Sequence, residues 1–162
     1  MGAGGSTCTP GPFRPATAAG AFVTMVEFFE IAEKRDSLSA SQSWVEQKQV
    51  TAGGYTMTVA CKIHKDFSDQ VSLTFGVALR SGEWDDYVEW PFSKTVTFTV
   101  PHLVDYYKDL KLPISLEGDN VVRKPKQGWT NSARWSERLY WDNISRSGFL
   151  RNNVLRVNVE VL

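Results

Sequence analysis

Two histidines, His64 and His102, are the only imidazole groups in the chain of 162 residues. His64 falls on the polar side of an alternating segment, and His102 follows Pro101 in a connecting region. Neither has a second histidine or a carboxylate at the spacing of a zinc site, such as HxH or HExxH. We therefore expect both histidines to be surface residues without a metal or a catalytic role.

The acidic residues and the cysteines also lack the arrangement of a reactive site. Glu83, Asp85 and Asp86 form a small acidic stretch, but the twelve-residue calcium pattern is absent, so we expect solvated charges. Cys61 falls on the predicted core side of its strand, where a thiol is usually unreactive. Cys8 and Cys61 form neither a disulfide framework nor a zinc pattern.

Two further kinds of catalytic motif are missing. No serine stands in a GxSxG sequence, and Gly53 and Gly54 come before an alternating strand pattern, whereas a phosphate-binding loop opens a helix. We therefore expect a protein that is not an enzyme and that uses no cofactor or metal.

Charge and hydropathy narrow the class of partner. Lys plus Arg and Asp plus Glu number 18 each, so the net charge is zero and gives no electrostatic reason to expect nucleic-acid binding. The chain has no apolar run of about 18 residues and no signal-peptide pattern at its start. We expect a cytoplasmic protein that does not insert into membranes.

The elements that must carry any site are predicted mainly by alternation of polar and apolar residues, the pattern of strands with one buried face. In the segment 55–63, Tyr55, Met57, Val59, Cys61 and Ile63 share one side. The first strand segment could also be read as a helix. About eight strands are predicted, near residues 21–31, 44–50, 55–63, 70–80, 95–100, 119–123, 132–137 and 154–162. Eight short strands separated by turn signals predict an all-β, antiparallel sandwich.

The connections differ in length. Residues 65–69 form a short turn, which predicts a hairpin, whereas 81–90 and 101–117 are longer, and the second is compatible with a helical turn. One short helix is predicted at 140–146, with Asp142 or Asn143 as its cap and Gly148 at its end. Residues 1–19 are rich in Gly, Pro, Ala and Thr, so we expect a flexible leader or linker before a domain at 20–162.

Aromatic residues make up 12% of the chain, and several fall outside the predicted core. Trp84 lies in a loop, Trp129 and Trp135 flank the seventh predicted strand, and Tyr140 and Trp141 lie at the start of the helix. Such rings can cover the ends of a sandwich. They can also line a groove in which an edge strand pairs with a bound peptide. Both interpretations stay open from composition alone.

An ordered set of motifs resembles the MATH domain, which TNF-receptor-associated factors (TRAFs), speckle-type ubiquitin-ligase adaptors and meprins share. The motifs are GYxM at 54–57, VSLxF at 71–75, EWPF and an alternating TVTF within 89–98, VRKP at 122–125, and GFLRNNVLRVNV at 148–159. The similarity to TRAFs is carried by Trp90-Pro91-Phe92 and by Phe22, Val26 and Phe29. It implies an eight-stranded antiparallel sandwich in which Trp90 and Phe92 close one end of the core.

The resemblance also implies binding of short, extended peptides along an edge strand. By position, the Arg and Tyr of the TRAF third strand correspond to Ala60 and Lys62, and the Phe of the fourth strand corresponds to Thr74. Asp66 keeps the acidic residue after the turn. The serine-rich region of the family falls near Asp119, Asn120 and Val121, none of which is a serine.

In the speckle-type adaptors, a WGF segment on the seventh strand lines the groove, and the nearest stretch here ends in Arg134 and Trp135. The expected peptide-binding set is therefore Lys62, Asp66, Thr74, Asn120, Arg134 and Trp135. Lys62 and Arg134 close to an aromatic anchor favour an acidic or phosphorylated peptide.

The first hypothesis is an adaptor that binds peptide segments of receptor tails or of ubiquitin-ligase substrates. The alternative is a structural or oligomerisation module with a degenerate groove, and a hydrolase or lectin comes third. We expect the isolated domain to be a monomer, and a trimer to form where a coiled coil precedes it.

Overall fold

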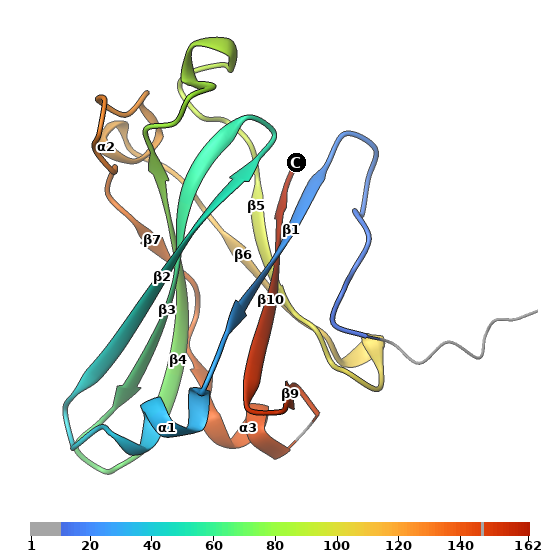
Figure 1. Cartoon of the computed structure of the whole chain (residues 1–162), viewed down its shortest axis with the longest axis vertical. Coiled ribbons are helices and arrows are strands. Elements are labelled where there is room, and N and C mark those ends of the chain that lie inside the picture. The colour runs from blue at the N-terminus through green and yellow to red at the C-terminus, as the bar shows by residue number, and fades with distance from the viewer. Residues whose placement is uncertain (1–10, 147) are drawn as a thin grey trace, which may run out of the picture.

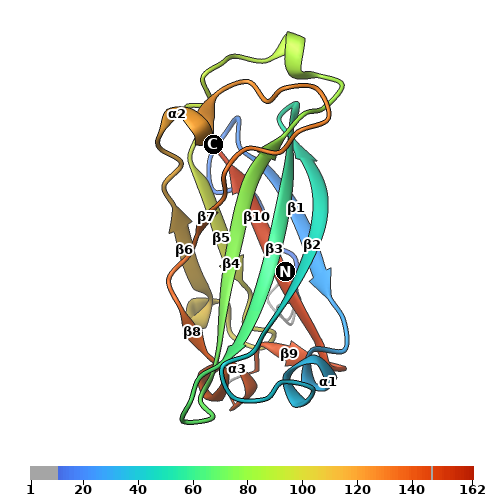
Figure 2. The same ribbon diagram turned by 90° about the vertical axis from the view of Figure 1, so that its left-hand side faces the viewer.

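The computed structural model describes residues 11–146 and 148–162, which form two antiparallel sheets stacked face to face (Figures 1 and 2). In sheet A the strand order is β1-β10-β5-β6, and β9 pairs with β10. In sheet B the order is β2-β3-β4-β7, and β8 pairs with β4. The predicted antiparallel sandwich is thus confirmed.

Sheet A consists of β1 (Phe22–Phe28), β5 (Val96–Val100), β6 (Leu110–Ile114), β9 (Leu150–Arg151) and β10 (Val154–Val161). Sheet B consists of β2 (Ser43–Ala52), β3 (Tyr55–Lys65), β4 (Val71–Arg80), β7 (Arg134–Trp135) and β8 (Leu139–Tyr140). The described part of the chain therefore has ten strands and not the predicted eight. The prediction missed β8 and β9, which have two residues each, and β6, where Pro113 interrupts the pattern but is tolerated in an edge strand.

Helices replace two parts of the predicted strands. The segment predicted as a strand at 119–123 is the short helix α2 (Asp119–Val122), because the amides of Val121 and Val122 both donate to the carbonyl of Gly118. The first predicted strand ends at Phe28, and α1 (Ile31–Asp36) follows. The region 101–117 contains a 3₁₀ turn, η3 (Tyr106–Lys108), before β6.

The predicted short helix is present as α3 (Trp141–Arg146). It begins at Trp141, so Asp142 and Asn143 lie inside its first turn and neither precedes it as a cap. Figure 1 shows α1 and α3 at one end of the sandwich, and α2 with the 81–90 connection at the other.

The core lies between the inner faces of the two sheets. β3 and β4 form the predicted hairpin, in which Cys61 pairs with Phe75 and Lys62 with Thr74. The inward side chains of both strands are buried, as their alternation predicts. Phe75 joins the layers, because its ring centroid lies 6.4 Å from that of Phe28 and 6.1 Å from that of Phe98, both in sheet A.

Trp90 and Phe92 close the end of the core that lies near α2, as the resemblance implies. The Tyr55 ring meets both edge-on, with centroid distances of 5.2 Å to Trp90 and 4.7 Å to Phe92. The Trp90 indole donates to the carbonyl of Asp85, and the Phe92 amide donates to the carbonyl of Val122. The Trp90–Pro91 peptide bond is cis.

Two expectations about polar residues are wrong. His102 is buried and not exposed: its Nδ1 accepts the backbone N–H groups of Val104 and Asp105, and its ring packs edge-on against Phe149. Asp85 is also buried, in the 3₁₀ turn η2 (Asp85–Tyr87), where its Oδ2 accepts from the Gly82 amide. Local backbone donors, which alternation does not reveal, hold both side chains inside.

Within residues 11–146 and 148–162, no helix combines the length and the apolar character needed to cross a membrane.

Residues 1–10, including Cys8, lie outside the described residues. The division into a leader and a domain at residue 20 stays a prediction. Arg14 and Thr17, which belong to the predicted leader, hydrogen-bond to the sandwich.

Candidate peptide-binding site

The candidate site lies on the outer face of sheet B, where Trp135 packs across β4. Trp135 in β7 pairs with Gly76 in β4. A Cβ atom at Gly76 would lie 2.8 Å from the indole ring, so a glycine is needed for the ring to lie this close to the strand. The Trp135 side chain stays 44% exposed and is available to a partner.

Two hollows flank the ring of Trp135. The first has a volume of about 300 Å³, and its lining includes Lys62 of β3, Thr74 of β4 and Arg138, which lies between β7 and β8. The second has a volume of about 230 Å³, and its lining includes the small residues Ala60, Gly76 and Ala78. Trp135 lines both hollows, so it separates two neighbouring positions on one surface. We call this surface the Trp135 groove.

Lys62, Thr74 and Trp135 are the predicted site residues that the fold brings together. Lys62 pairs with Thr74 in the β3–β4 ladder, so both side chains project from the outer face. The Lys62 Nζ lies 6.0 Å from the centroid of the Trp135 ring, at the outer limit of a cation–π contact. All three residues line the first hollow.

The lining of the first hollow carries a positive charge. It comprises two cations, Lys62 and Arg138, and four uncharged or weakly basic residues, His64, Ser72, Thr74 and Trp135. His64 is held by a contact of 2.7 Å between its Nδ1 and the Ser43 hydroxyl. Because the lining contains no carboxylate, the hollow is suited to a negatively charged group.

Arg134 and Asn120 do not line the two hollows of this groove, and Arg134, which pairs with the buried Val77, projects from the face of sheet B opposite to Trp135. The Arg134 Nη2 donates to the carbonyl of Glu117 at 2.9 Å, and the Asn120 amide donates to the Ser132 hydroxyl at 3.2 Å. These bonds connect β7 and the residues before it to the 117–120 segment. Both side chains thus support the edge of the sheet at the groove.

Asp66 is occupied by the β3–β4 turn. Its Oδ1 accepts the Ser68 hydroxyl at 2.8 Å and the backbone amides of Ser68 and Gln70 at 2.8 and 2.9 Å. The hydrogen bond from the Ser68 hydroxyl is the main cause that lowers the pKa of Asp66. Asp66 lines neither hollow and acts as a turn residue.

Sequence reasoning missed Gly76 and Arg138. A glycine inside a strand is a known sign of close approach by another group, so Gly76 could have been noticed. Arg138 carried no such sign, because its place depends on β7 and β8, which both pair with β4 and have two residues each.

The comparisons with known proteins agree with this architecture. The family model of the TRAF/meprin MATH domain matches residues 41–158. A solved structure of TRAF5 from Notothenia coriiceps is similar, with a TM-score of 0.61 and 18% sequence identity, over 86% of this chain and 72% of that chain. A search of curated proteins found no match. Because the family model covers most of its length, the chain belongs to the TRAF/meprin MATH-domain family, whose members serve as protein–protein interaction modules.

Proposed function

We propose that the Trp135 groove binds an extended peptide segment of a partner protein, so that the domain acts as an adaptor. The observation that carries the proposal is the exposed Trp135 ring between two hollows, held close to the strand by Gly76. An aromatic anchor with small residues beside it gives a bound chain room for its backbone and a surface for an apolar side chain.

The charge of the first hollow supports a preference for acidic or phosphorylated peptides. Lys62 and Arg138 line it without a carboxylate, and a phosphate or carboxylate placed there gains charge-assisted hydrogen bonds. The proposed ligand is therefore a segment with an apolar side chain for Trp135 and an acidic group one or two positions away. Segments of receptor tails and of ubiquitin-ligase substrates are the proposed sources.

The proposed roles of the predicted residues differ. Trp135 is the apolar contact, and Lys62 and Thr74 meet the ligand in the first hollow together with Arg138. Arg134 and Asn120 act indirectly, because their hydrogen bonds tie β7 and the residues before it to the 117–120 segment. Asp66 contributes through the turn that connects β3 and β4.

The test uses a peptide selected against the full chain by unbiased display, with its affinity measured by calorimetry. Trp135→Ala and Lys62→Glu should each weaken binding by at least tenfold. Trp129→Ala and Lys65→Glu are matched controls that should bind normally, because Trp129 is an exposed tryptophan outside both hollows and Lys65 ends the same strand.

Unchanged affinity in both Trp135→Ala and Lys62→Glu would remove this surface as the site. If display selects no peptide and the chain self-associates in sedimentation, the structural or oligomerisation role takes its place.

A further inference from the structure

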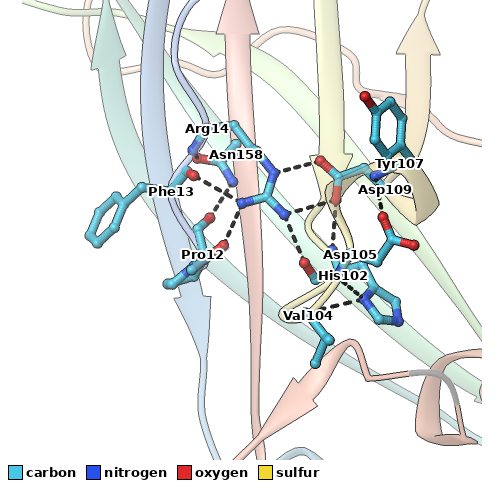
Figure 3. Close-up of polar contacts among 10 residues, drawn as sticks. Pro12, Phe13, Arg14, His102, Val104, Asp105, Tyr107, Asp109 and Asn158 are labelled. Atoms are coloured by element: carbon cyan, nitrogen blue, oxygen red, sulfur yellow. Dashed lines mark hydrogen bonds and ion pairs between the residues drawn. The ribbon is translucent and has the colours of Figure 1, made fainter. Parts of the chain in front are cut away.

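An N-terminal segment, residues 11–17, lies along the outer face of sheet A, on the opposite side of the sandwich from the Trp135 groove. Figure 3 shows Arg14 of this segment beside Asn158, His102 and Asp109. We call this segment the strap. Its Arg14 side chain is only 15% exposed and points into the connection between β5 and β6. The strap covers Asn158 of β10, which is buried although it faces outward from the core.

The guanidinium of Arg14 uses its full set of donors. Nε and Nη2 donate to the two carboxylate oxygens of Asp109 at 2.6 and 2.9 Å, a bidentate pair. Nη2 also donates to the carbonyl of His102 at 2.8 Å. Nη1 donates to the carbonyls of Phe13, at 3.0 Å, and of Gly11. Five N–H groups thus have five contacts, an arrangement that lysine, with three donors on a single point charge, does not reproduce.

The sandwich supplies three of these five contacts, through the Asp109 carboxylate and the His102 carbonyl. The Asp109 side chain is 7% exposed, and its Oδ1 also accepts the backbone amide of His102 at 2.8 Å. The ring of His102 accepts the amides of Val104 and Asp105 at 3.2 and 2.9 Å, which fixes the same loop from inside. The carboxylate is therefore held in place by its own loop before any arginine arrives.

The rest of the strap is held mainly through its backbone. The Asn158 amide group donates to the carbonyl of Pro12 at 2.8 Å and accepts the Arg14 amide at 3.4 Å. Farther along, Glu160 accepts the backbone amide and the hydroxyl of Thr17 at 2.7 and 2.8 Å. A hollow of about 220 Å³ beside the strap includes Val23, Thr99 and Tyr106 in its lining. These contacts select an extended backbone and a single arginine.

We propose that Asp109, Asn158 and Glu160 form a second peptide-binding site, the Arg14 site, which takes an extended, arginine-bearing segment of a partner protein. In this structure the strap fills it as an internal ligand. Charge complementarity supports the assignment: when the strap leaves, a mostly buried carboxylate loses its guanidinium, and a second arginine restores the lost pair.

The strap competes with a partner segment because it belongs to the same chain as the site. A short linker gives a tethered ligand an effective concentration on the order of millimolar, so the strap excludes weak ligands from the intact chain. A partner segment gains access when the Arg14 contact is weakened. The Arg14 site and the Trp135 groove lie on opposite faces of the sandwich. The proposed role of the groove does not depend on the Arg14 site.

The experiment adds a capped synthetic peptide with the sequence of residues 11–18, GPFRPATA, to the full chain and measures binding by calorimetry. Arg14→Ala removes the internal competitor and should bind this peptide at least tenfold more tightly than the unaltered chain does. Arg14→Lys keeps the charge and should give an intermediate affinity. Arg123→Ala, which removes an exposed arginine paired with Asp119, is the matched control and should behave like the unaltered chain.

Two changes remove the interaction itself. A peptide with alanine in place of its arginine should not bind Arg14→Ala, and the double variant Arg14→Ala, Asp109→Asn should lose at least tenfold in affinity for the original peptide. Amide NMR spectra establish that each variant is folded.

Equal binding by the unaltered chain, Arg14→Ala and Arg14→Lys would overturn the proposal. Dimers between Arg14→Ala and the unaltered chain would overturn the partner assignment, because the occupant is then the strap of a second copy.

Discussion

At the scale of single residues, burial decides what the side chains of this domain can do. Cys61 is inside the core, and burial raises the pKa of its thiol, with the nearby Glu46 adding to the effect. Thiolates and not thiols are the reactive form, so Cys61 is an apolar core residue in practice. Trp135 is the opposite case, because its large ring is exposed and lies outside the core.

The raised pKa of Cys61 predicts a loss of stability at alkaline pH. The folded chain keeps the thiol neutral, while the unfolded chain ionises it above its ordinary pKa of 9.0. The contribution is therefore fully present below pH 9 and is lost as pH rises, by at most about 1.4 kcal/mol per pH unit. Urea unfolding between pH 8 and 10 should show this slope, and Cys61→Ala should reduce it. Equal slopes in the two proteins would contradict the prediction.

Phe92 should carry much of the stability of the core end near α2. Its side chain is 3% exposed and packs edge-on against Tyr55, so Phe92→Ala leaves a cavity. We expect a loss of about 3–5 kcal/mol in the free energy of unfolding, measured by urea titration. Phe67→Ala, at a ring that is 86% exposed, should change it by less than about 0.5 kcal/mol. A Phe92→Ala loss as small as that of the control would show that the end is not packed as described.

At the scale of elements, the pairing of β4 with β7 depends on Gly76. Gly76→Ala places a methyl group where the Trp135 ring lies, and we expect the ring to move away from β4 at a cost of about 1–3 kcal/mol. The Trp135 indole resonance should shift, and affinity for the selected peptide should fall. In a Trp135→Ala background the same change should stabilise the strand by about 0.5–1 kcal/mol. Additive effects of the two substitutions would refute the contact.

The turn between β3 and β4 should depend on the carboxylate of Asp66. The pKa of this group is lowered, so its contribution is present at neutral pH and is lost as pH falls below 3.8. Asp66→Ala should speed amide hydrogen exchange at Ser68 and Gln70, which donate to Oδ1. Asp66→Asn retains an acceptor oxygen and should exchange more slowly than Asp66→Ala, without the acid dependence. Equal exchange in all three proteins would exclude this role.

The long strands could be predicted from sequence because burial on one face imposes alternation over many residues, as in β3, β4 and β10. The two-residue strands β8 and β9 could not, since their pairing is set by β4 and β10 and not by their own composition. The valines of α2 favoured a strand, yet the turn at Gly118 set a helix. At the candidate site, the register of the strands brings Lys62, Thr74 and Trp135 to one face of the sheet. Asp66 corresponds by position to the acidic residue of the TRAF pattern, but its side chain is hydrogen-bonded within its own turn.

At the scale of the whole molecule, the two proposed sites lie on opposite outer faces of one sandwich. Sheet B presents the Trp135 groove, and sheet A presents the Arg14 site. A tightly packed layer of aliphatic and aromatic side chains separates them, and no described residue lines a hollow at both sites. Perturbations at sites that are well separated and share no partner are usually additive in free energy.

Independence of the two faces is testable by hydrogen exchange and calorimetry on the same proteins. A peptide bound in the Trp135 groove should slow exchange in β4 and β7 and leave the amides of Val104 and Asp105 unchanged. Arg14→Ala should speed exchange at Val104 and Asp105, because their loop loses the strap that rests on it. Its affinity for the groove peptide should stay within about twofold of that of the unaltered chain. A larger change would mean that the strap and the groove are coupled through the core, so that release of one face alters binding at the other.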